Sequence, residues 1–230
     1  MPRIVIVHGT GAPPRSEELL RLEWLGSMQD ALAFAGDFST ELDARFVNLD
    51  GLRQAAAPDP DWEADTVTAW ARTARMPRTE GADLTRLGRS GYFCGLPEDE
   101  LLSAARTLRA FLHREAEDAV EQVVTEIEAG TDIVIGHAIG GIAAFDAVCL
   151  SQGVATLITI GTPLCAADAL GRSAAGLGDC RWVNLVDRWD TLAYPAQGAL
   201  AIDCEPRLRS PRNYLASPEF GRILAEALSA

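Results

Sequence analysis

The stretch IVIGHAIGGIAAFDAV at positions 133–148 most constrains what this chain can fold into. A short β-branched run leads into Gly136, His137 and Ala138, and Gly140 and Gly141 then open a long apolar segment. This pattern predicts a strand, a sharp turn and a helix. Glycines around such a turn leave room for close backbone approach that a side chain would block. The turn position itself is Ala138.

The rest of the chain alternates short apolar runs with longer helical patterns. The runs that predict strands are 4–7, 45–49, 132–135, 156–160, 182–186 and 199–202. Helices are predicted at 17–35, with Ser16 as N-cap and Gly36 as the stop, at 139–150, and from Pro218 to 228. Strands that alternate with helices and are apolar throughout predict an α/β fold with a mostly parallel sheet flanked by helices. The 230 residues, 48% hydrophobic, favour a single domain over 1–230.

A long insertion, approximately 55–130, separates the second and third predicted strands. Its second half, 97–129, has a helical apolar stripe, and we expect a helical cap there. Its middle gathers arginines, among them Arg75, Arg78 and Arg86, in an otherwise acidic chain. Guanidinium groups on a lid would hold a carboxylate or phosphate of a ligand. The alternative is an ordinary solvated loop.

Charge and composition exclude several classes of function. A net charge of −13 argues against a nucleic-acid partner, which needs a basic surface. No stretch is long and apolar enough to span a bilayer, and the first residues are too short a run for a signal peptide. The five cysteines are scattered, which favours free thiols and a cytoplasmic location, with Cys149 expected in the core. No metal-ligand spacing or third glycine of a dinucleotide motif is present, so no metal and no cofactor are expected.

Four motifs in fixed order carry a resemblance to a known family. They are VHGTG at 7–11, GHAIGG at 136–141, TIGTPL at 159–164, and the pattern W-x-N-x-x-D-x-x-D at 182–190. Together they resemble the α/β-hydrolase superfamily, in its bacterial lipase- and esterase-like branch. The second motif matches the nucleophile elbow G-x-S-x-G, with Ala138 where that elbow has serine. The resemblance spans nearly the whole chain.

The resemblance implies a role for each matching position. Ala138 takes the place of the nucleophile, and Asp190 best fits the acid of the triad, with Asp187 second. The backbone N–H groups of Thr10, in the turn that Gly11 completes, and of Ile139 would form the oxyanion hole. Such amides stabilise negative charge on a carbonyl oxygen whether or not a serine is present. The implied ligand is a small acyl or anionic molecule, with a protein partner as the alternative.

The chain departs from the family at the two groups that start acyl transfer. Ala138 has no hydroxyl, and none of the histidines, His8, His113 and His137, follows Asp190. His8 and His137 flank the expected oxyanion donors, where they would orient loops or act as acid or base. Three functions stay open: an esterase-like hydrolase that has lost its serine, naturally or by exchange; a lyase, cyclase or isomerase that reuses the pocket; or a pseudo-hydrolase that binds a ligand or protein.

Overall fold

The computed structural model describes residues 3–9, 16–50, 98–112, 114–127, 130–163, 172–187, 199–202 and 214–230. Within these residues, six strands form one sheet in the order β2-β1-β3-β4-β5-β6, and every neighbouring pair is parallel. The strands are β1 (Ile4–Gly9), β2 (Ala44–Asn48), β3 (Ile133–Ala138), β4 (Thr156–Ile160), β5 (Arg181–Asp187) and β6 (Ala199–Ile202). All six predicted strands are therefore confirmed: β4 and β6 have the predicted bounds, and the other four differ by one to three residues at an end.

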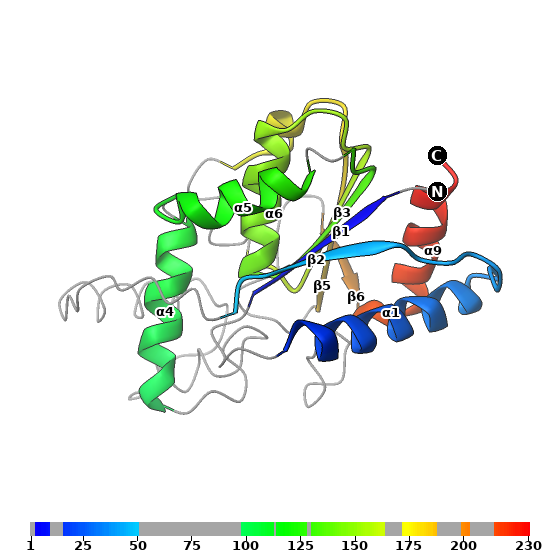
Figure 1. Ribbon diagram of the computed structural model, residues 1–230, viewed down its shortest axis with the longest axis horizontal. Helices are drawn as coiled ribbons and strands as arrows, with labels where there is room; N and C mark the ends of the chain where they lie inside the picture. The colour runs from blue at the N-terminus through cyan, green and yellow to red at the C-terminus, as the bar shows by residue number, and fades with distance from the viewer. Residues whose placement is uncertain are drawn as a thin grey trace.

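Helices cover both faces of this sheet (Figure 1). On one face, α1 (Glu17–Phe34) and α9 (Pro218–Leu228) pack side by side against a core that includes Ile4, Ile6 and Ile135. On the other, α5 (Glu117–Ile127) and α6 (Ile139–Leu150) pack over Val5, Val7 and Val134, and α4 (Glu98–Leu112) contacts α6. A short 3-10 turn, η1 (Ala174–Leu177), also lies against α6. The prediction of a parallel α/β fold is confirmed.

The ends of α1 and α9 follow the predicted signals. Ser16 Oγ accepts a hydrogen bond from the N–H of Leu19 at 3.3 Å, and Gly36, at φ 89°, follows the end of α1. Ser217 Oγ accepts from the N–H of Phe220 at 3.2 Å, and Pro218 opens the helix. A capping oxygen satisfies one of the first amides, and glycine adopts the left-handed conformation at little cost.

The second half of the insertion is helical, as predicted, but α5 is part of the layer on the sheet. Its buried residues Ala119, Val123 and Ile127 pack in the same cluster as Val5 of β1 and Ile142 of α6. A helical stripe indicates that a helix is buried, and it does not indicate what covers it. The first part of the insertion, 55–97, which includes Arg75, Arg78 and Arg86, lies outside the described residues. A cap or lid there stays a prediction.

The strand order fixes where a ligand would enter. The order begins 2-1-3-4-5, one of the two common orders of doubly wound sheets. The chain leaves β1 toward β2 on one side and reaches β3 on the other, while α1 and α6 lie on opposite faces. In such sheets ligands bind outside the carboxyl ends of the strands at this switch point. Here it lies between β1 and β3, where His8 and Ala138 are found.

Candidate functional site

Ala138 occupies a strained turn between β3 and α6. It is the last residue of β3 and the N-cap of α6, with φ 53° and ψ −125°. L-residues rarely adopt a positive φ, and such a conformation costs about 1–3 kcal/mol, so surrounding structure must hold it in place. The side chain is 2% exposed. The sequence prediction of a sharp turn centred on residue 138 is confirmed.

The neighbouring glycines allow α6 to start directly against the ends of β1 and β4. A Cβ at Gly140 would lie 2.5 Å from the carbonyl oxygen of Val7, and one at Gly141 would lie 1.9 Å from Oγ1 of Thr162. A Cβ at Gly136 would lie 2.5 Å from the Cα of Gly141. Most of these obstacles are backbone atoms, which cannot move aside as a side-chain end can. Each glycine of the motif is therefore required by packing.

Replacing Ala138 with glycine should cost far less stability than the same change elsewhere in the helix. Glycine loses more backbone entropy than alanine and here also loses a buried methyl group, but it relieves the positive-φ strain. We expect the free energy of unfolding of Ala138→Gly to stay within about 1 kcal/mol of the parent, because these effects offset one another. Ala143→Gly, fully buried in α6, should lose about 2 kcal/mol. Urea unfolding of both variants tests this, and equal losses would rule out strain at position 138.

The first amides of α6 have no capping side chain at the N-cap position. Ala138 makes no side-chain hydrogen bond to the helix, whereas the N-caps of α1 and α9 both do. The N–H of Ile139 is the first amide of the helix, and the positive end of the helix dipole favours an oxygen that carries negative charge. Of the two expected oxyanion donors, Ile139 is described, and Thr10 and its neighbour Gly11 lie outside the described residues.

His8 and His137 contact each other directly. They stand opposite one another in the register of β1 and β3, so both side chains project from the same face of the sheet. Their Nδ1 atoms are 3.1 Å apart, and the rings stack at 8°. The side chain of Trp24, from α1, meets both rings edge-on. His8 is 1% and His137 6% exposed, so the structure brings together the two histidines that the sequence singled out.

Asp50 completes this cluster, and the sequence analysis missed it. Its Oδ2 lies 3.2 Å from Nε2 of His8, and its side chain is 1% exposed. The contact is an ion pair when the imidazole of His8 is protonated. The N–H of Asp50 donates to Oδ1 of Asn48, which lies beside His8 in register. The sequence contains one signal for this residue, which is its place two residues after β2. The strands of a parallel sheet all end at the same edge, so an acid just after one strand lies near the ends of its neighbours.

The acid positions implied by the resemblance are described only in part. Asp190 lies outside the described residues, so its place as triad acid stays a prediction. Asp187, the second choice, ends β5 fully buried, and its main-chain N–H donates to Oη of Tyr214 at 3.0 Å.

Other polar residues of the third and fourth motifs have a structural role. Thr159 Oγ1 donates to Oδ1 of Asn184 at 2.8 Å and accepts from Nε1 of Trp182 at 3.0 Å. The indole of Trp182 also meets the ring of Phe145, on α6, edge-on. These contacts bind β4, β5 and α6 together.

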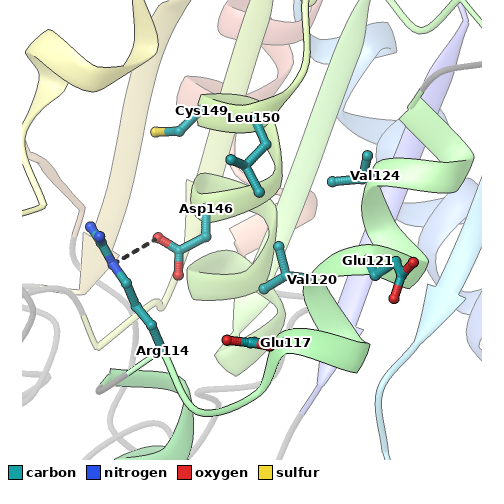
Figure 2. Close-up of a pocket in the computed structure, with 8 residues that line it drawn as sticks. All are labelled: Arg114, Glu117, Val120, Glu121, Val124, Asp146, Cys149 and Leu150. Carbon is teal, nitrogen blue, oxygen red and sulfur yellow. Dashed lines mark ion pairs between the residues drawn. The ribbon is translucent and has the colours of Figure 1, made fainter.

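A separate hollow of about 500 Å³ lies at the other end of α6 (Figure 2). Val120 and Val124 of α5 face Leu150 across it, and Arg114 pairs with Asp146 at 4.0 Å. Because α6 has 12 residues, this hollow is roughly 16 Å along the helix from Ala138. It is therefore not part of the site at the switch point.

Cys149 lines this second hollow and is exposed, so the expectation of a core residue was wrong. The last turn of α6 reaches the surface, which an apolar sequence pattern does not reveal. Partial burial, and then the Asp146 carboxylate, raise the pKa of the Cys149 thiol. Burial raises the pKa of Cys180 to about 11. Neither thiol is activated for nucleophilic attack, since the thiolate is the reactive form.

Within the described ranges, no group of three or more histidine, cysteine, aspartate or glutamate side chains is arranged to hold a metal ion. No helix in the described part of the chain has the length and apolar character needed to cross a membrane.

The fold and the site define a class: an α/β protein with a doubly wound parallel sheet and a strained strand-to-helix turn at its switch point. Comparisons with known proteins add no relative. No family model matches the chain, and neither the curated proteins nor the solved structures contain a match.

Proposed function

We propose that this chain is an α/β-hydrolase-type protein of esterase or lipase descent that binds a small carbonyl-containing ligand at the turn between β3 and α6. Ala138 takes the position of the nucleophile, and the N–H of Ile139 points to the ligand oxygen. One observation carries the proposal: Ala138 holds a positive φ at the N-terminus of α6, at the switch point of the sheet. Strain of this kind persists mainly where function requires it.

The ligand class follows from the chemistry of the turn. An amide at a helix N-terminus binds an oxygen that is partly or fully negative, as in an ester, acyl or carboxylate group. The methyl of Ala138 cannot form an acyl-enzyme, so the chain as it stands would bind such a ligand without covalent turnover. The proposal therefore includes a pseudo-hydrolase, which binds the ligand but does not cleave it. A nucleophile introduced at position 138 should then react with an ester.

Ala138→Cys is expected to acquire an ester-reactive thiol. A thiolate needs less help from a general base than a serine hydroxyl does, so the variant does not depend on a triad histidine. The N-terminus of α6 should lower the thiol pKa, and the oxyanion donor should speed acylation. With 4-nitrophenyl acetate, we expect acylation about 100-fold faster than for a small thiol at equal thiolate concentration, measured as burst kinetics and by mass spectrometry of the residue 138 peptide.

The chain supplies matched controls for this experiment. Cys149 lies on the same helix, near its C-terminal end, and its raised pKa should leave it almost unreacted. The parent protein gives the background from the other cysteines. Ala138→Ser, treated with a fluorophosphonate, gives a second readout that depends on a base as well. A folded Ala138→Cys variant that acylates no faster than Cys149 would contradict the proposal.

A further inference from the structure

The second hollow, at the C-terminal end of α6, has the size and the wall of a small-molecule site. Its volume of about 500 Å³ lies within the range of about 300–1,000 Å³ that ligand pockets occupy. Val120 and Val124 of α5 form one wall, and Leu150 of α6 faces them (Figure 2). Leu150 is 72% exposed, so apolar surface here is open to water. An alkyl group that enters the hollow would remove this surface from water, which is favourable.

One face of α5 combines this apolar wall with negative charge. Glu117, Val120, Glu121 and Val124 are three or four residues apart in turn, so they share one side of the helix, and all four line the hollow. The two glutamates are exposed and stand at a spacing where like charges repel each other. Within the part of the chain that the structure describes, neither carboxylate forms an ion pair. A cation bound beside them would relieve this repulsion.

The other charged groups around the hollow do not cancel the two glutamates. Asp146 accepts hydrogen bonds from Nε and Nη2 of the buried Arg172, and Nε of Arg114 stands 4.0 Å from the same carboxylate. Among the described residues, three carboxylates thus face two guanidinium groups. A bound anion would add to this excess of negative charge, whereas a bound cation would balance it.

We propose that the second hollow binds an aliphatic ammonium compound. Its alkyl chain lies between the valines of α5 and Leu150, and its cationic head lies beside Glu117 and Glu121. The residues that line the hollow all belong to the described ranges. The hollow is roughly 16 Å along α6 from Ala138, so binding here does not depend on the function proposed for that turn.

Cys149 reports directly on occupancy, because its thiol lines the hollow and is exposed. We expect n-octylammonium to protect Cys149 from alkylation by N-ethylmaleimide, which is uncharged, as measured by mass spectrometry of the peptide that contains residue 149. Octanoate has a chain of the same length and the opposite charge, and it should need about tenfold higher concentration for half protection. From butylammonium to octylammonium, each added methylene group should lower the half-protecting concentration about threefold.

Three variants separate the charge from the apolar wall. Glu117→Gln combined with Glu121→Gln should raise the half-protecting concentration of octylammonium about fivefold and should lower that of octanoate. Asp118→Asn is the matched control, since it removes an exposed acid next to Glu117 that does not line the hollow; the change should be less than about twofold. Leu150→Ser should weaken both ions about threefold. All these side chains are exposed, so each variant should fold as the parent does.

The outcomes that overturn the proposal are distinct. Circular dichroism at each ligand concentration shows that the protein stays folded during the measurement. No protection by octylammonium, equal protection by octanoate, or protection that the two glutamine substitutions leave unchanged would each overturn it. Stronger protection by octanoate would instead assign the hollow to an anion held by Arg114. These readouts need neither an ester nor a nucleophile at position 138, so they can fail while the proposed function stands, and the reverse.

Discussion

Asp146→Asn is expected to lose about 3–5 kcal/mol of folding free energy, because it removes the carboxylate charge that pairs with a buried guanidinium. Arg172 has a side chain only 1% exposed, and its Nε donates to Oδ1 of Asp146 at 2.8 Å. Its Nη2 donates to Oδ2 of Asp146 and to the carbonyl oxygen of Phe111, in the last turn of α4. One arginine thus joins α4, α6 and the chain before η1.

The loss should appear as a fall of about 10 °C in the thermal midpoint for a chain of this size. Glu226→Gln is the matched control. It also removes one carboxylate charge that faces two arginines, Arg181 at 2.8 Å and Arg222 at 2.6 Å, but all three side chains are exposed. Solvent screens such pairs, so the control should leave the midpoint nearly unchanged. Equal effects of Asp146→Asn and Glu226→Gln would mean that Arg172 is not desolvated.

Gly140→Ala is expected to destabilise the protein by about 3 kcal/mol, through overpacking at the start of α6. The added Cβ would lie 2.5 Å from the carbonyl oxygen and 2.8 Å from the carbonyl carbon of Val7, and 3.0 Å from the N atom of Gly9. These are backbone atoms of a central strand, which is hydrogen-bonded on both sides. The helix and the strand would have to separate, and the turn at Ala138 would move with them.

Gly26→Ala is the control for this prediction. Gly26 lies in α1, is exposed, and an added Cβ there meets nothing within 4 Å. Alanine has a higher helix propensity than glycine, so this variant should gain about 0.5–1 kcal/mol. Chemical unfolding of the two variants should give shifts of opposite sign. A Gly140→Ala protein as stable as the parent would show that α6 does not start against β1.

The sequence predicts the elements well because each depends on local chemistry. The β-branched run IVIV at 4–7 predicts a buried strand, and Ser16 and Gly36 mark the ends of α1 where the structure has them. The glycines at 136, 140 and 141 predict the sharp turn without any knowledge of its neighbours. These features are visible because the physical cause lies within a few residues.

The site needs information that no local pattern contains. His8 and His137 are 129 positions apart, and their contact follows from the pairing of β1 with β3 across a long insertion. Asp50 reaches His8 because β2 lies on the other side of β1, which is a matter of strand order. Likewise, the stripe of α5 predicts a buried helix, but its place on the sheet follows from packing against α6.

The mass of the Ala138→Cys protein after brief treatment with 4-nitrophenyl acetate tests the central claim most directly. The account predicts a single acetyl group on residue 138, formed well before any on Cys149. An acetyl group that appears at both positions at the same slow rate, in a protein shown to be folded, would contradict a reactive turn at the switch point of this sheet.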